Sequence, residues 1–354
     1  MTGTVADGGS EQAGVPRPEH VHPGILSHVH PGLVSHVHPG LVSHVHPGAI
    51  SHMRLGTIST AVAPLLHGPS RPARVVAATR HAVHLATGDR ELPALAVVTR
   101  DAIRLPNALV LPFSSADRPL DLNAPWASFG SGRVVIGTVR FEPEASWTPP
   151  RVQDASSPPD LAHIREATAL LDASAQPLPP PLAPRLTDLR HALHTDDAGE
   201  VRRAARALVG LGPGLTPSGD DILCGALLAS RAWGGPLAPL SEAVTDASLR
   251  TPLLSAALLR HAARGECVPQ AHSFLRALSG DGALEPALRA LLAVGHHSGG
   301  DLARGVLAVG LSRAGATPGV RDDYPVNYPR LKPGLAARVI TGDDEARLHP
   351  ALTR

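Results

Sequence analysis

The residues best suited to chemistry lie in two short acidic segments that share one pattern. Residues 218–227 read SGDDILCGAL and residues 298–307 read SGGDLARGVL, so both match S-G-x-D-x-x-x-G-x-L without a gap. A serine followed three residues later by an acid, just before an apolar run, is typical of a capped helix N-terminus. The pattern therefore predicts two helix starts that carry the carboxylates of Asp221 and Asp301. Such carboxylates can serve in proton transfer or in metal binding.

A glycine-rich loop precedes the first of these segments. Residues 210–217 read GLGPGLTP, in which the glycines permit backbone angles that side chains forbid and the prolines stiffen the chain. A loop of this kind that enters a helix presents unpaired N–H groups and the positive end of the helix dipole, which favour an anion. Asp220 and Asp221 would repel a bare anion, so we expect either a divalent cation such as Mg²⁺ or a proton-transfer role beside it. We expect the two helix starts to converge on one ligand.

The predicted site contains residues for catalysis, for substrate binding and for metal binding. The candidates for catalysis are Asp221, Asp301 and His296, and His296 is included because an imidazole titrates near neutral pH and lies just before the second helix start. The candidates for Mg²⁺ are Asp220, Asp221 and Asp301. The candidates for substrate binding are Gly212, Gly214, Thr216, Ser218, Gly219, Asp220, Ser298 and Gly299. Ordinary helix capping is the alternative explanation for either segment alone.

These segments also resemble the signature segments of a known family. GLGPGLTPSGDD at 210–221 and GHHSGGD at 295–301 are similar, in the expected order, to those of the DUF2877 family. The resemblance covers about residues 53–315. Because that family includes a subunit of the oxamate carbamoyltransferase of allantoin degradation, the resemblance implies carbamoyl transfer between oxamate and phosphate. It further implies a small anionic substrate, namely carbamoyl phosphate, oxamate or oxalurate, and a hetero-oligomer with other carbamoyltransferase subunits.

The composition limits the class of protein. The chain has 354 residues, is 43% hydrophobic and carries a net charge of +1, which fits a soluble protein of about two domains without a basic field for nucleic acid. No apolar run is long enough to cross a membrane. Cys224 and Cys267 match neither a disulfide framework nor a zinc pattern, and Cys224 is expected in the core. We therefore expect a cytoplasmic protein that binds neither nucleic acid nor membrane.

The type of periodicity changes along the chain. Short β-branched runs predict a mainly antiparallel β domain at 53–141, with a loop at 120–132. Trp126 in this loop is expected to pack in a core or between domains, and the alternative is that it lines a pocket. After a linker at 142–160, helical patterns predict an α-helical domain at 161–315 that carries both glycine-rich helix starts. The fold class is therefore α+β, and residues 316–354 are expected to form a tail.

Residues 1–52 carry a strict eight-residue repeat, HVHPGILS and its variants, that begins at His20. Pro-Gly in every unit interrupts helix and strand, so the repeat predicts a disordered tail. Its histidines allow an alternative function as a metal-binding protein. A further alternative is a non-catalytic ligand-binding or assembly subunit, in which Gly225 and Gly305 let helices pack closely.

Overall fold

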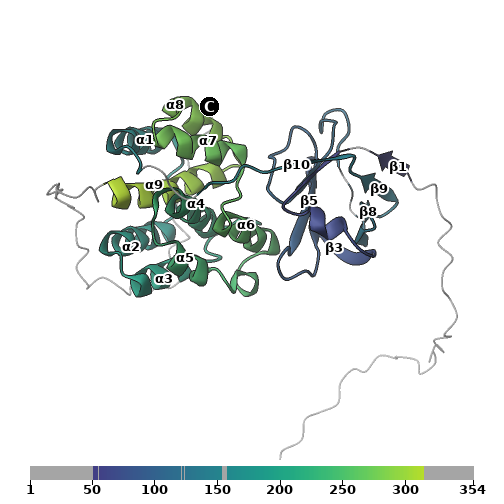
Figure 1. Ribbon diagram of the computed structural model, residues 1–354, viewed down its shortest axis with the longest axis horizontal. Helices are drawn as coiled ribbons and strands as arrows, with labels where there is room; N and C mark the ends of the chain where they lie inside the picture. The colour runs from purple at the N-terminus through teal and green to yellow at the C-terminus, as the bar shows by residue number, and fades with distance from the viewer. Residues whose placement is uncertain (1–50, 55, 121, 123, 154–157, 315–354) are drawn as a thin grey trace, which may run out of the picture. The chain divides into compact units, whose positions relative to one another are not determined.

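The chain is described by a computed structural model that covers residues 51–54, 56–120, 122, 124–153 and 158–314 (Figure 1). Within these residues the strands come before residue 148 and the α-helices after residue 160. The predicted α+β class is therefore confirmed. Most of the histidine repeat and the C-terminal tail lie outside the described residues.

The strands form a curled mixed sheet in which most pairings are antiparallel. Their bounds are β1 Ser51–Arg54, β2 Thr57–Ser59, β3 Arg71–Ala78, β4 Ala82–Ala86, β5 Ala94–Val98, β6 Ala108–Val110, β7 Ala127–Gly130, β8 Arg133–Ile136, β9 Val139–Glu142 and β10 Ala145–Trp147. The order across the sheet is β1-β9-β8-β7-β3-β4-β5-β6-β2-β10. Parallel pairings join β1 to β9, β10 to β2 and β5 to β6. Leu85, Phe129 and Phe141, from distant strands, share one apolar core, which the curled sheet encloses.

Three features of this region differ from the sequence-based expectations. Strand β7 lies inside the segment 120–132 that was expected to be a loop, and it pairs with both β3 and β8. Trp126 is 52% exposed, so it does not occupy a core position, and Phe129 is buried instead. Strand β7 has only four residues, too few for an alternating pattern to be recognised in the sequence. Its pairing with neighbouring strands therefore decides its conformation. Strand β10 lies within the expected linker 142–160.

The second half of the described chain is helical. The helices are α1 Leu161–Ser174, α2 Leu182–Thr195, α3 Ala198–Arg206, α4 Ser218–Trp233, α5 Leu237–Ala243, α6 Leu253–Ala263, α7 Pro269–Leu278, α8 Leu284–Leu292 and α9 Ser298–Ala314, and short 3-10 helices lie at η1 Ala63–Leu66 and η2 Ala247–Leu249. Helix α2 was not predicted, because its first residues belong to a proline-rich segment; proline is tolerated in the first turn.

Helices α4 and α9 pack side by side at the centre of the helical region (Figure 1). A Cβ atom added to Gly225 would lie 2.1 Å from the carbonyl oxygen of Leu302, and one added to Gly305 would lie 1.9 Å from that of Ile222. These contacts are reciprocal, since each glycine faces the backbone of the other helix. The predicted close approach at Gly225 and Gly305 is therefore confirmed.

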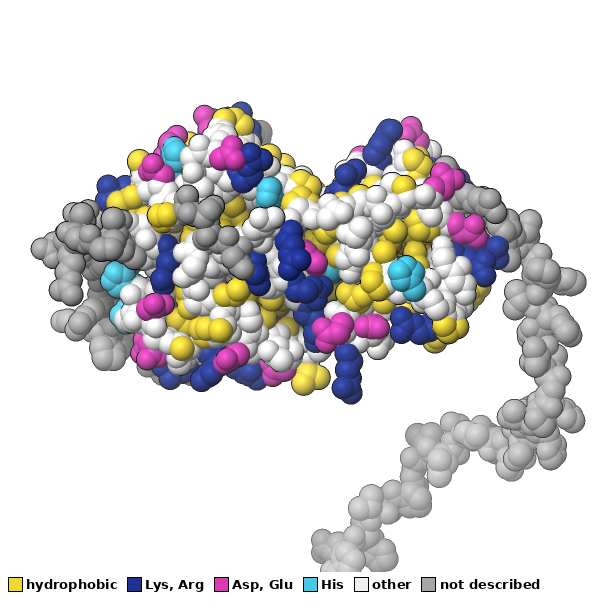
Figure 2. All heavy atoms as spheres, viewed as in Figure 1, with side chains coloured by type: hydrophobic (Ala, Val, Ile, Leu, Met, Phe, Trp, Pro, Cys, Tyr) yellow, Lys and Arg dark blue, Asp and Glu magenta, His cyan; other side chains and the backbone are white. Residues whose placement is uncertain are grey.

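In the described part of the chain, every helix is too short or too polar to span a lipid bilayer. Figure 2 shows that basic side chains are interspersed with acidic ones on the face drawn.

Candidate functional site

The starts of α4 and α9 are not capped in the way the sequence pattern predicts. Helix α4 begins at Ser218, and Pro217 occupies the N-cap without a side-chain cap. The hydroxyl of Ser218 instead interacts with the carboxyl of Asp301 on the other helix. The hydroxyl of Ser298 likewise interacts with the carboxyl of Asp221. The predicted Ser218–Asp221 capping box is therefore wrong, because each serine serves the aspartate of the other helix.

Gly219 and Gly299 let each helix start lie against the end of the preceding helical segment. A Cβ atom on Gly219 would lie 2.1 Å from the carbonyl oxygen of Leu208, and one on Gly299 would lie 1.9 Å from that of Leu291. The N–H of Gly219 donates to the Leu211 carbonyl at 2.8 Å, and the N–H of Gly299 donates to the Val294 carbonyl at 2.9 Å. These two amides, predicted to bind substrate, are therefore already engaged by their own loops.

The first loop reaches the surface before it enters α4. Gly212 and Gly214 have φ angles of +122° and +91°, a backbone region that favours glycine, and both are exposed. Thr216, two residues on, lies with its Oγ1 3.2 Å from Oγ of Ser298 at the start of α9. The two segments therefore lie side by side, and their convergence on one ligand stays a prediction.

Asp220 is fully buried and hydrogen-bonded on both carboxyl oxygens. Its Oδ1 accepts from the N–H of Gly210 at 2.8 Å. Its Oδ2 accepts from the hydroxyl of Ser255 at 2.7 Å and from that of Thr251. The Asp220 side chain thus joins the glycine-rich loop to Ser255 in the first turn of α6 and to Thr251 just before that helix. Full pairing of a buried polar group is the arrangement expected for a structural carboxylate.

Replacement of Asp220 by asparagine is expected to lower the free energy of unfolding by about 2 kcal/mol, because one accepting oxygen becomes a donating NH₂ group and hydrogen bonds to a charged group contribute about 1.5–3 kcal/mol. Urea titration followed by circular dichroism measures the loss. Asp117→Asn, at an exposed carboxyl bonded to Ser114, is the control and should change little. Thr251→Val should cost less in the Asp220→Asn background than alone; strictly additive losses would contradict the network.

The carboxyls of Asp221 and Asp301 are both buried and lie close enough for their charges to interact. Burial is the main cause that raises the pKa of Asp221 to about 8, and the charges of Asp301 and Asp220 add to it, while the Ser298 hydroxyl opposes it. Burial also raises the pKa of Asp301, against the opposing effects of the Ser218 hydroxyl, Arg304 and His297. Asp221 is therefore largely protonated at neutral pH.

Arg304 distinguishes the two carboxyls, and it was not among the predicted site residues. Its Nη1 donates to Oδ1 of Asp301 at 3.0 Å, and both side chains are largely buried. By contrast, no group in the described part of the chain hydrogen-bonds Oδ2 of Asp221. The spacing of three residues between Asp301 and Arg304 on one helix is a signal that could have identified this pair.

His296 and His297 lie exposed in the loop before α9. Their ring centroids are 4.3 Å apart in an edge-to-face arrangement. His297 lies close enough to Asp301 to lower the pKa of that carboxyl. His296 therefore lies beside the site, and its ring contacts that of His297.

The acidic residues do not fit the expected Mg²⁺ site. Among the described residues no group of three or more His, Cys, Asp or Glu side chains could hold a metal ion. The physical reason is that Asp220 has both oxygens bonded to protein donors, while Asp301 is paired with Arg304. Two of the three expected ligands are therefore engaged elsewhere.

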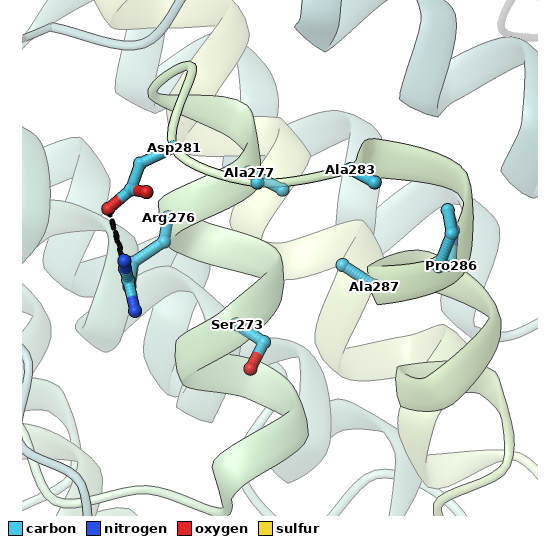
Figure 3. A pocket seen from close by; sticks show the side chains of 8 residues that line it. Ser273, Arg276, Ala277, Asp281, Ala283, Pro286 and Ala287 are labelled. Atoms are coloured by element: carbon cyan, nitrogen blue, oxygen red, sulfur yellow. Dashed lines mark hydrogen bonds and ion pairs between the residues drawn. The ribbon is translucent and has the colours of Figure 1, made fainter.

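A hollow of about 400 Å³ lies between α7 and α8 (Figure 3). It is lined by Ser273, Arg276, Ala277, Asp281, Gly282, Ala283, Pro286 and Ala287. Arg276 points to Asp281 and donates to its Oδ2 at 2.5 Å, so the two charges compensate each other. None of these described lining residues belongs to the predicted site.

The fold and the site define an α+β protein whose central helix pair carries two facing, buried aspartates at its N-termini. The family model described as oxamate carbamoyltransferase subunit AllH matches residues 208–310. This segment includes both loops and most of α4–α9, so the predicted family resemblance is confirmed over it. No solved structure matches the chain.

Proposed function

We propose that this chain is a subunit of an oxamate carbamoyltransferase and binds a small anionic substrate between the starts of α4 and α9. The candidate substrates are carbamoyl phosphate, oxamate and oxalurate. The observation that carries the proposal is the contact between Thr216 and Ser298, which brings the two loops of the matched segment together above two buried carboxyls.

The charges at this point are compatible with an anion, although three aspartates lie there. Both carboxyl oxygens of Asp220 are engaged by three protein hydrogen-bond donors, and Asp301 is paired with Arg304. Asp221 is largely uncharged at pH 7, because its pKa is about 8. The positive ends of two helix dipoles and the hydroxyls of the site then favour negative charge.

The roles of the remaining candidates follow from where they lie. Thr216 provides a hydroxyl donor to the anion, Ser218 and Ser298 hold the carboxyls of Asp301 and Asp221, and the exposed residues Gly212 and Gly214 form the rim. Asp221 and Asp301 face the reacting groups, and His296 is the acid or base at the surface, where an imidazole exchanges protons with solvent. Other subunits in the cytoplasm complete the complex.

The test is titration calorimetry of the full chain with carbamoyl phosphate, oxamate and oxalurate. Thr216→Val is expected to weaken binding by about 10–100-fold, since a hydrogen bond to a charged group contributes about 1.5–3 kcal/mol. Ser298→Ala is also expected to weaken binding, because Ser298 contacts Thr216 and the carboxyl of Asp221. Thr168→Val is the matched control, because its half-buried hydroxyl bonds only within α1, to the Ile164 carbonyl. Failure of the folded wild-type chain to bind any of the three ligands would refute the proposal and favour an assembly subunit.

A further inference from the structure

One buried atom at the site has no partner in the described protein. Asp221 is 7% exposed, and its Oδ2 has no hydrogen-bond partner among the described residues. Leaving a buried acceptor unpaired costs about 1–3 kcal/mol. The carboxyl of Asp221 interacts with Ser298, which contacts Thr216 of the first loop, so a ligand held between the two loops can supply the missing donor.

Oδ2 of Asp221 lacks a partner from its own helix because the two copies of the helix pattern differ at one position. Helix α9 has Arg304 three residues after Asp301, whereas α4 has Cys224 three residues after Asp221. Arg304 donates to Asp301, but the Cys224 side chain is a buried thiol whose pKa burial raises, so it carries no charge. Asp301 thus receives a cationic partner from its own helix and Asp221 does not.

We propose that Oδ2 of Asp221 accepts a hydrogen bond from the NH₂ group of the ligand, and that the site thereby selects anions that carry a primary amide. The inference rests on the proposed function. Carbamoyl phosphate, oxamate and oxalurate each contain an NH₂ group next to a carbonyl, together with an anionic group. The hydroxyls and helix N-termini suit the anion, whereas the unpaired carboxyl oxygen needs a donor, and in all three ligands the NH₂ group can supply it.

The neutral state of Asp221 is compatible with an anionic ligand whose NH₂ group binds this carboxyl. With a pKa of about 8, the carboxyl does not place a full negative charge beside the anion at pH 7, and Oδ2 accepts from the ligand when the proton is on Oδ1. Asp301, which Arg304 and the hydroxyl of Ser218 already engage, has less capacity to accept from the same ligand. A site that pairs with a ligand N–H rejects an analogue without it, because its own buried group is then unpaired.

Oxamate and pyruvate provide the matched ligand pair, because both contain a carboxylate next to a carbonyl and they differ by NH₂ against CH₃. Calorimetry of the full chain at pH 7 is expected to show oxamate bound at least about tenfold more tightly than pyruvate. Asp221→Leu, which keeps the approximate shape but has no acceptor, is expected to reduce that ratio to near one. Asp301→Asn is the comparison and is expected to retain the ratio.

Each outcome is decisive. Equal binding of oxamate and pyruvate by the wild-type chain would overturn the inference and leave the proposed function standing. Discrimination that survives Asp221→Leu, or is lost only in Asp301→Asn, would assign the NH₂ group to another acceptor. If Asp221→Leu does not fold, Asp221→Ala serves in its place, and the wild-type ratio still tests selectivity. Binding of no candidate substrate by the folded chain would overturn the proposed function, and the inference with it.

Discussion

Replacement of Gly305 by alanine is expected to destabilise the protein by more than about 3 kcal/mol or to prevent the helical region from folding. The new Cβ would lie 1.9 Å from the carbonyl oxygen of Ile222 and 2.9 Å from the backbone nitrogen of Ala226. Overpacking of a core costs about 1–3 kcal/mol when side chains can adjust. Here the obstacle is backbone, so α4 and α9 would have to separate. Urea unfolding followed by circular dichroism measures the effect.

A matched control for this change is Gly199→Ala in α3. A Cβ atom there would meet no backbone and would lie 3.2 Å from Oδ1 of Asp197, the oxygen that caps α3. Alanine is favoured over glycine in a helix by up to about 1 kcal/mol, which offsets a small shift of this cap, so Gly199→Ala should change stability by less than about 1 kcal/mol. Gly225→Ala should resemble Gly305→Ala, because its Cβ would lie 2.1 Å from the Leu302 carbonyl oxygen. Equal stability of the Gly305 and Gly199 variants would show that the helices are not in close contact.

Asp221→Asn is expected to raise the free energy of unfolding by about 4 kcal/mol at pH 7. The folded-state pKa of about 8 lies above the ordinary value of 3.8, so the folded state binds the proton more tightly than the unfolded state. Stability therefore falls as pH rises between these two values, by about 1.4 kcal/mol for each pH unit. Asparagine never ionises and removes this loss, so the variant and the wild type should differ little near pH 4 and most at pH 8.

Thermal unfolding of both proteins from pH 4 to pH 8 tests this dependence. Asp281→Asn is the control, because it alters an exposed ion pair with Arg276, whose contribution is about 0–1 kcal/mol. Parallel curves for the wild type and Asp221→Asn would mean that Asp221 is ionised in the folded protein. A variant that is more stable but binds ligand less well would fit a carboxyl retained for function at the expense of stability.

Local patterns were sufficient where the interacting residues are near in sequence. The serine, aspartate and glycine spacing predicted the starts of α4 and α9, and glycine one turn on predicted their close packing. Asp197 caps α3 as its spacing indicates, since its side chain accepts from the N–H of Glu200.

The same patterns failed where a distant partner decides the outcome. The hydroxyl of Ser218 serves Asp301 rather than its own helix, so the capping box predicted for α4 does not form. Strand β7 forms because β3 and β8 flank it, although its own four residues carry little signal. Helix α2 begins within a proline-rich segment and is held by its contacts with α3 and α9.

The sequence by itself determined that two matching helix starts carry Asp221 and Asp301, because this follows from spacing within a few residues. It also indicated which family the segment 208–310 resembles. Only the tertiary structure decided what each carboxyl does. Asp220 receives hydroxyl donors from 31 and 35 residues away, and the loops meet through a contact 82 residues apart. Local sequence spacing cannot predict such partners, because the packing of α4 against α6 and α9 brings them together.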